Sequence, residues 1–290
     1  MKNKILFLNG GSCTNKEKRL IEEANKVNLQ IDVMNCKENA LIGDPRKFLE
    51  KMEGYSFIFS LSNQTYCNYF VNGFSLLGKE TWPNNNLNKI RDKFLQAQFI
   101  NSLGLKHPKT LLINTLEKYD LEKIVEKELG GFPCVIKKVT GTFGLNVGKV
   151  SSVEEIENFI NEKIRIRKLT GVTSFLLQEF ISEAVGEDYR VLVLNGEVLG
   201  GIKRTSSDSS DFRANISLGG IGSRFNVPEE VKEICLKISK ELKGFYLGID
   251  LIKKGDEWNV IEINPCPQFQ GFEKATGINV AGKIIENFLK

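Results

Sequence analysis

Residues 248–281, GIDLIKKGDEWNVIEINPCPQFQGFEKATGINVA, contain two apolar runs separated by the segment KKGDE. This pattern predicts a β-hairpin with a glycine-containing turn. Asp250 lies in the first run and Glu262 in the second, and Asn264 follows Glu262 by two residues. Because side chains two residues apart in a strand share one face, Asn264 lies on the same face as Glu262. The stretch therefore predicts three oxygen ligands that converge on one point.

The two carboxylates of this hairpin indicate a metal site. A buried acid loses its hydration, so it needs a positive partner. Carboxylate and amide oxygens suit magnesium, which usually arrives with nucleotide phosphates. The alternative is that Asp250 and Glu262 lie on the solvent face of an amphipathic hairpin. The Pro- and Gly-containing loop of residues 264–277 favours the metal site, since functional residues often lie on such loops.

Composition and charge restrict the class of protein. The chain has 290 residues, of which 41% are hydrophobic and 26% charged, and its net charge is +4. These values are typical of a globular protein with a substantial core. No run of five like charges indicates a nucleic-acid partner, whereas a polyanionic nucleotide is compatible with the charge. No apolar stretch approaches the roughly 20 residues of a membrane helix, so no membrane partner is expected.

The cysteines and the histidine exclude several kinds of site. The six cysteines form no CxxC pair and no signal peptide precedes them, so we expect reduced thiols in a cytoplasmic protein. His107, the single histidine, precedes Pro108, which disfavours a histidine-based mechanism. The sequence leaves the oligomeric state open, a homo-oligomer included.

The first part of the chain predicts a parallel sheet. Strands are expected over residues 4–10, 30–36 and 54–63, with a helix between the first two, and such a β-α-β order favours parallel strands. The unit is expected to end near residues 83–86. Residues 62–74, SNQTYCNYFVNGF, are interpreted as a loop that contributes to substrate choice.

The middle of the chain predicts helices around a glycine-rich hairpin. We expect one helix over residues 88–103, a strand over 107–114 and a helix over 116–129. Strands over 134–138 and 147–150 enclose a loop with Gly141 and Gly144. Glycine backbones can approach phosphate oxygens closely and Lys137 could supply charge, but an ordinary hairpin explains the pattern as well.

The remaining segments alternate helices and strands. A capped helix is expected over residues 152–169, a buried strand over 174–182, and a hairpin around the turn Asn195-Gly196. Residues 206–224 are interpreted as a loop carrying Arg213 and Asn215, either for phosphate contact or as a mobile surface segment. Further helices are expected over residues 228–242 and 279–290.

In this order the motifs resemble the ATP-grasp superfamily, and more narrowly the RimK-like carboxylate–amine ligases. The resemblance is most specific over residues 88–282. It implies an α/β ATP-grasp fold, α+β in its C-terminal part. It also implies an N-terminal parallel domain over residues 1–86, a small lid-bearing subdomain over 87–182, and a C-terminal subdomain with the magnesium site over 183–290.

The resemblance implies roles for particular residues. Nucleotide binding is implied for Lys93, Lys137, Gly141, Thr142, Phe143, Gly144, Gln178, Glu179, Phe180, Ile181, Glu187, Asp188 and Arg190. Arg204, Arg213 and Asn215 are implied at the phosphate and the acyl intermediate. Asp250, Glu262 and Asn264 are implied as ligands of magnesium, or of manganese in its place. The sequence departs from the family pattern at Pro265–Gln268, where a small residue, Ser, Pro and Gly are common.

The implied activity is ATP-dependent formation of an amide or peptide bond through an acyl phosphate. The expected partners are ATP, a carboxylate substrate and an amino acid such as glutamate. Two alternatives remain at this point: an ATP-grasp kinase that phosphorylates a hydroxyl group, and an ATP-binding regulatory module without turnover.

Overall fold

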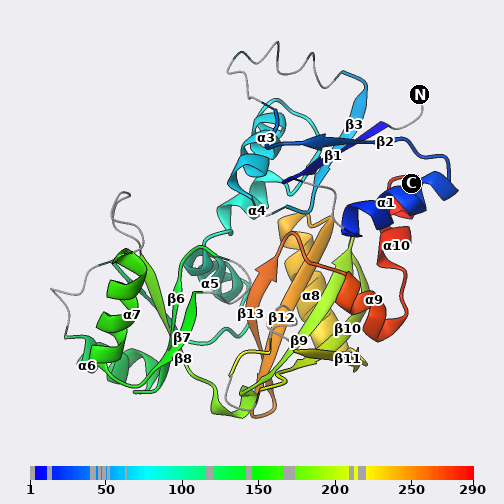
Figure 1. The fold of residues 1–290 in the computed structure, drawn as a ribbon. Helices are drawn as coiled ribbons and strands as arrows, with labels where there is room; N and C mark the ends of the chain where they lie inside the picture. Colours follow the sequence, from blue (N-terminus) through cyan, green and yellow to red (C-terminus); the bar gives the residue numbers. More distant parts are fainter. Residues whose placement is uncertain are drawn as a thin grey trace.

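Figure 1 shows the chain in a computed structural model. The structure describes residues 4–11, 15–39, 44, 47, 50, 53–62, 64–114, 120–141, 146–165, 174–208, 212–214 and 220–290. The described strands form three sheets, which meet around the helix α5 (Lys93–Ser102).

The first sheet is parallel, as the β-α-β pattern predicts. Its strand order is β2-β1-β3-β4, with β1 Lys4–Asn9, β2 Ile31–Asn35, β3 Tyr55–Ser60 and β4 Thr81–Trp82. The helix α1 (Asn15–Lys26) buries Leu20 and Ala24. The interpretation of residues 62–74 as a loop is wrong, because α3 spans Thr65–Leu76. Its buried side chains recur at helical spacing and pack on the sheet; they are Cys67, Phe70, Val71 and Phe74.

The single helix predicted over residues 88–103 is two helices, α4 (Asn85–Lys89) and α5. The break has a local cause. The Asp92 side chain accepts hydrogen bonds from the amides of Phe94 and Leu95, at 2.8 and 3.1 Å. This N-cap starts a new helix at Lys93 and so places Lys93 in its first turn.

The second sheet is antiparallel, with the order β5-β8-β6-β7. Its strands are β5 Thr110–Ile113, β6 Cys134–Lys138, β7 Val147–Val150 and β8 Phe175–Glu179. The helix α6 (Leu121–Ile124) continues as a π-helical turn over Val125–Leu129, and α7 spans Val153–Arg165. Buried residues of these elements, among them Val125, Ile136 and Ile156, form a separate core.

The third sheet is antiparallel, with the order β11-β10-β9-β12-β13. A short 3-10 turn over Ser182–Ala184 precedes it. Its strands are β9 Glu187–Leu194, β10 Glu197–Thr205, β11 Ile221–Phe225, β12 Tyr246–Lys254 and β13 Glu257–Asn264. The predicted hairpins β9–β10 and β12–β13 are confirmed. The prediction of a loop over residues 206–224 is wrong in part, because Ile221 begins β11 and pairs with Thr205.

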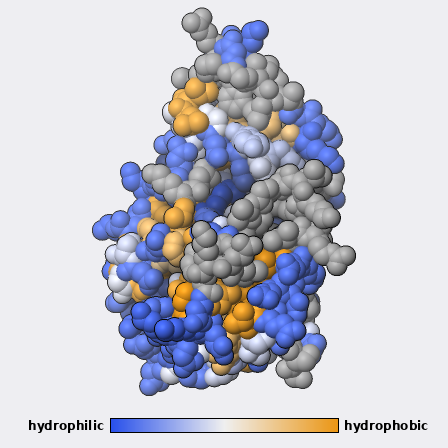
Figure 2. Space-filling model, turned by 90° about the vertical axis from the view of Figure 1, so that its left-hand side faces the viewer, coloured by the Kyte–Doolittle hydropathy of each residue, from blue (hydrophilic) through white to orange (hydrophobic). Residues whose placement is uncertain are grey.

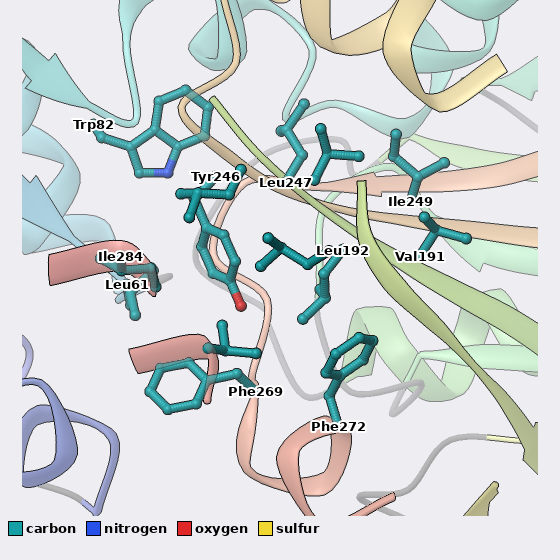
Figure 3. Packing of buried hydrophobic residues seen from close by; sticks show 14 of the residues in the cluster. Leu61, Trp82, Val191, Leu192, Tyr246, Leu247, Ile249, Phe269, Phe272 and Ile284 are labelled. Atoms are coloured by element: carbon teal, nitrogen blue, oxygen red, sulfur yellow. The ribbon is translucent and has the colours of Figure 1, made fainter. Parts of the chain in front are cut away.

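The C-terminal part adds three helices, α8 (Glu229–Leu242), α9 (Gln270–Thr276) and α10 (Val280–Asn287). The loop predicted up to residue 277 is therefore shorter, since α9 begins at Gln270. Figure 3 shows Phe269 and Phe272 packed beside Tyr246 under the third sheet. The same core includes Ile5 and Phe7 of β1, so the first and third sheets share one hydrophobic core.

The described part of the chain holds no helix long and apolar enough to cross a membrane. Figure 2 shows hydrophilic residues over most of the described surface on one face, with smaller apolar patches between them. Each sheet takes its strands from one of the three predicted residue ranges. The domain boundaries themselves stay predictions.

Candidate active site

One cavity of about 970 Å³ lies where the three sheets meet. Its lining combines the start of α5, the ends of β6 and β8, and one face of the third sheet. The residues predicted from the sequence that line it are Lys93, Lys137, Gly141, Gln178, Glu179, Phe180, Ile181, Glu187, Asp188, Arg190, Arg204, Arg213, Asp250, Glu262 and Asn264. Thr142, Phe143, Gly144 and Asn215 lie outside the described residues. Fold and sequence thus bring the predicted groups to one place.

A row of charged side chains crosses the third sheet and lines this cavity. We call Arg204, Asp188, Arg190, Asp250 and Glu262 the charged row. The strand register pairs Arg204 with Asp188, Arg190 with Asp250, and Asp250 with Glu262. These positions lie on one face because residues two apart in a strand point the same way.

Asp250 is the most constrained acid of the charged row. Its side chain is 3% exposed and accepts two hydrogen bonds from Arg190, from Nε at 2.7 Å and from Nη2 at 2.6 Å. Arg204 Nη2 lies 2.9 Å from Asp250 Oδ2, and Arg204 Nε donates to Asp188. Burial acts to raise the pKa of Asp250, but the charges of Arg190 and Arg204 outweigh it and hold that pKa below its ordinary value. Asp250 is therefore ionised at neutral pH.

Lys93 connects α5 to the charged row. Its Nζ donates to Glu262 Oε1 at 2.6 Å, and its backbone amide donates to Val139 O at 2.9 Å. Burial acts to raise the pKa of Glu262, while the Lys93 charge lowers it more strongly, so the pKa of Glu262 lies below its ordinary value. The ion pair thus links the start of α5 to β13.

Lys137 occupies the opposite wall, at the end of β6. Its Nζ donates to Gln178 Oε1 at 2.8 Å, and Gln178 Nε2 donates to Thr110 Oγ1 at 2.8 Å. Burial and the nearby charge of Lys93 lower the pKa of Lys137 to about 8, against a smaller opposing effect of Glu262. A negative charge placed beside Lys137 would raise this pKa again.

The segment after β8 forms the connection between the second and third sheets. Glu179 pairs with Lys254, and the Lys149 ammonium lies 4.6 Å from the centre of the Phe180 ring. Ile181 is buried, which gives this edge of the cavity an apolar wall. Glu187 pairs with Lys203 at 2.6 Å, so it faces a cation of the neighbouring strand.

The residues of β12 and β13 fit a magnesium ion. The carboxylates of Asp250 and Glu262 come from paired positions. The negative charge of Asp250 acts to raise the pKa of Glu262, so a cation between the two carboxylates would relieve their repulsion. Asn264 Oδ1 accepts from the Cys266 amide at 2.9 Å and keeps a second lone pair. The described residues contain no cluster of three or more His, Cys, Asp or Glu that could hold a metal. An ion here would need the Asn264 amide and ligands from a substrate, which is usual for magnesium.

Some cavity residues were not predicted individually, although Thr65 and Asn68 lie within residues 62–74, which were expected to contribute to substrate choice, and Cys266 and Gln268 lie within the departure at Pro265–Gln268. Thr65 and Asn68 of α3, Arg91 before α5, and Cys266 and Gln268 after β13 also line the cavity. The helical spacing of Cys67, Phe70 and Phe74 could have identified α3 and its opposite polar face. Arg91 lies two residues before the predicted site residue Lys93, and this proximity could have identified it.

Comparison with known proteins agrees with the resemblance to RimK-like ligases. A sequence model described as the RimK-like ATP-grasp domain matches residues 90–288. The chain is 29% identical to the coenzyme gamma-F420-2:alpha-L-glutamate ligase of Methanococcus maripaludis, over 99% of this chain and 98% of the relative. It is 30% identical to a probable alpha-L-glutamate ligase of Halorhodospira halophila, over 98% of this chain and 94% of the relative.

Solved structures establish the fold. The ATP-grasp ligase PsnB, complexed with minimal precursor, Mg and ADP, superposes with a TM-score of 0.71 at 16% identity, over 98% of this chain and 96% of that chain. The D-alanine–D-alanine ligase of Bacillus anthracis gives a TM-score of 0.70 at 16% identity, over 99% of this chain and 96% of that chain. The ATP-grasp fold predicted from the sequence is confirmed.

Proposed function

The chain belongs to the RimK-like ATP-grasp family and is an ATP-dependent carboxylate–amine ligase, and we propose that it joins glutamate or a related amino acid, through its amine, to a carboxylate of a peptide, protein or cofactor. The observation that carries this proposal is that Lys93, Lys137 and the charged row line the same cavity. The names of the full-length relatives support glutamate as the added amino acid.

The chemistry requires a set of cations close to carboxylates. A carboxylate is a poor electrophile, so ATP first converts it to an acyl phosphate, which the amine then attacks. Negative charge develops on the phosphoryl oxygens in both steps, and fixed cations stabilise it. We assign this role to Lys137, Arg204 and Arg213, which all line the cavity. No protein nucleophile is needed, which agrees with a site built without a histidine.

We assign the nucleotide and the metal ion to two groups of residues in this cavity. We propose that Gln178, Glu179, Phe180 and Ile181 hold the adenine, with Lys93, Gly141, Glu187, Asp188 and Arg190 completing the nucleotide site. Asp250, Glu262 and Asn264 would hold magnesium, or manganese in its place, and the ion would supply Lewis-acid stabilisation of phosphate oxygens. Thr142, Phe143, Gly144 and Asn215 keep their proposed roles at the phosphates.

We also propose the domain division at residues 1–86, 87–182 and 183–290, and a cytoplasmic location. The free thiols of Cys36, Cys67, Cys134, Cys235 and Cys266 support a reducing compartment.

The test is an assay with purified protein, ATP, magnesium, a panel of carboxylic acids and a panel of amino acids. We expect release of ADP and phosphate only when both an acid and an amine are present, together with an amide product found by mass spectrometry. An acid labelled with heavy oxygen should transfer one labelled oxygen to the released phosphate, because the acyl phosphate contains that atom.

Two results would contradict the proposal. ADP formed with a hydroxyl acceptor and without an amine would indicate a kinase. Tight ATP binding without turnover for any acid and amine would indicate a regulatory module.

A further inference from the structure

The cavity extends beyond the charged row to the helix α3 of the first sheet. Asn68 lies one turn into α3 and lines the cavity, as does Thr65. Asn68 Oδ1 is buried and has no hydrogen-bond partner among the described residues. A buried amide oxygen without a donor costs about 1–3 kcal/mol, so such atoms in a binding cavity are candidate ligand contacts.

A cation from another element lines the same cavity. Arg91 lies between α4 and α5 and lines the cavity together with Cys266 and Gln268. Arg91 and Cys266 thus come from separate elements and share the lining of this cavity. The lining of this cavity therefore combines a guanidinium group with a buried amide oxygen.

The wall that carries Cys266 is held in place by the first sheet. Trp82 Nε1 donates to Pro265 O at 3.0 Å, and Cys266 Sγ lies 3.6 Å from Ser60 O. Residues 265–268 are thus fixed against the sheet on which α3 packs. This arrangement places Asn68 and the loop after β13 on a common support.

An amino acid that supplies its amine presents two groups to the enzyme. Its own carboxylate does not react and keeps its charge, so it needs a cation that does not also serve the phosphate. Lys93, Arg190 and Arg204 contact the acids of the charged row, and Lys137 lies beside Gln178. Arg91 lines the same cavity and is not among the cations that we assign to the phosphate. Guanidinium binds carboxylates well because its planar donors match the two oxygens.

We propose that Asn68 and Arg91 form the subsite for the amino acid that supplies the amine. Arg91 binds its carboxylate, and Asn68 Oδ1 accepts a hydrogen bond from its nitrogen. The inference rests on the proposed ligase function and adds which residues recognise the amine substrate. It gives α3 a role in substrate choice, although α3 lies outside the matched family domain of residues 90–288.

This subsite serves the second step of the reaction, in which the amine displaces the phosphate. The neutral amine attacks the carbonyl carbon of the acyl phosphate and a C–N bond forms. The C–O bond to the phosphoryl group breaks, and the surplus proton of the nitrogen leaves with the phosphate. Asn68 and Arg91 orient the nitrogen and take no part in the proton transfer.

The experiment separates the two half-reactions. Hydroxylamine is a small nucleophile that traps an acyl phosphate as a hydroxamate and does not need a carboxylate contact. For Asn68→Ala we expect the KM for the amino acid to rise about 10-fold, which corresponds to the loss of one hydrogen bond of about 1.4 kcal/mol. For Arg91→Gln we expect a rise of at least about 10-fold, because a charged contact is lost. In both variants, hydroxamate formation from acid, ATP and hydroxylamine should stay within about two-fold of the parent protein.

Asn72→Ala is the matched control, since Asn72 lies one turn further along α3 and does not line the cavity. It should leave both reactions unchanged, and urea midpoints should show that all three variants are folded. An unchanged KM for the amino acid in Asn68→Ala and Arg91→Gln would overturn the subsite while leaving the ligase function intact. Loss of hydroxamate formation in these folded variants would overturn it as well, because the residues would then serve the activated acid. Absence of any hydroxamate with the parent protein would overturn the proposed function and the subsite together.

Discussion

Arg190 binds both carboxylate oxygens of Asp250, at 2.7 and 2.6 Å, and thereby joins β9 to β12 at the centre of the third sheet. Arg204 contacts the same carboxylate from β10 at 2.9 Å. One buried acid therefore contacts two guanidinium groups that line the cavity. A nucleotide phosphate and a metal ion would compete for these same contacts, the phosphate for the arginines and the metal for the acid.

Arg190→Lys should destabilise the fold although it keeps the charge. A lysine ammonium cannot form the two parallel hydrogen bonds that the guanidinium makes, so Asp250 would lose a buried partner. We expect the free energy of unfolding to fall by about 1–3 kcal/mol, measured by urea denaturation. Arg224→Lys is the control, because Arg224 is an exposed residue of β11. Equal stability of the two variants would show that the two-point contact contributes nothing.

Glu262→Gln should abolish turnover with little loss of stability. The side chain is 37% exposed and its ion pair with Lys93 is worth about 0–1 kcal/mol, so the fold should survive. Loss of the charge removes a proposed metal ligand, and we expect ADP release to fall on the order of 100-fold or more.

A control for this variant lies on the same strand. Glu257 is 61% exposed and approaches Lys106 at 3.6 Å, away from the cavity lining. Glu257→Gln should keep full turnover. Near-normal ADP release by Glu262→Gln would remove this residue from the metal assignment.

The strands of the site were predictable because their signals are local. Apolar runs bounded by glycine turns define β12 and β13, and Asn195-Gly196 fixes the β9–β10 hairpin. The positions of Asp250 and Glu262 then follow from the period of a strand. Lys93 was also identified, although the helix break before it was not, because the Asp92 cap acts within an otherwise continuous helical pattern.

The partners of these residues were not predictable from local patterns. Arg190 and Asp250 are separated by 60 positions, and they meet because β9 lies between β10 and β12 in the sheet. Such neighbours depend on long-range strand order, which hydrophobic periodicity does not contain. Residues 62–74 were expected to contribute to substrate choice, but the place of α3 beside the cavity depends on the packing of the first sheet against the third.

Binding of ATP should take up a proton at mildly alkaline pH. Burial and the charge of Lys93 lower the pKa of Lys137 to about 8, and a phosphate beside it would raise that pKa again. Calorimetric titrations in two buffers with different ionisation enthalpies should show proton uptake at a pH of about 8 and much less at about 6.5, where Lys137 is already charged.

The control for this titration is Lys137→Arg, which stays protonated and should abolish the uptake. Lys149→Arg, next to Phe180, should retain it. The lowered pKa of Lys137 also determines how this residue contributes to stability as the pH changes. Between about 8 and the ordinary value of 10.5 the unfolded chain binds more protons at Lys137 than the folded chain, so its contribution to stability rises with pH there. Proton uptake that persists in Lys137→Arg would assign it to another group.

Gly248→Ala should disturb the loop that follows the proposed metal ligand Asn264 and carries Cys266 and Gln268 of the cavity lining. A Cβ at residue 248 would lie 2.7 Å from Pro267 Cβ and 3.6 Å from Leu192 Cδ2, closer to the proline than packed carbons approach. The loop cannot yield freely, because Trp82 holds Pro265 and Cys266 lies against Ser60. We expect a loss of about 1–3 kcal/mol in the free energy of unfolding and a reduced turnover, since Asn264 and Gln268 flank the displaced residues.

The double variant Gly248→Ala with Pro267→Gly tests the cause of this effect. Removal of the Pro267 side chain takes away the atoms that the new methyl group would meet, so part of the lost stability should return relative to Pro267→Gly alone. The interaction energy of the double-mutant cycle, obtained from urea denaturation, measures the steric conflict directly. Additive effects of the two substitutions would contradict it, because independent changes at residues 248 and 267 would mean that β12 and the loop are not in close contact.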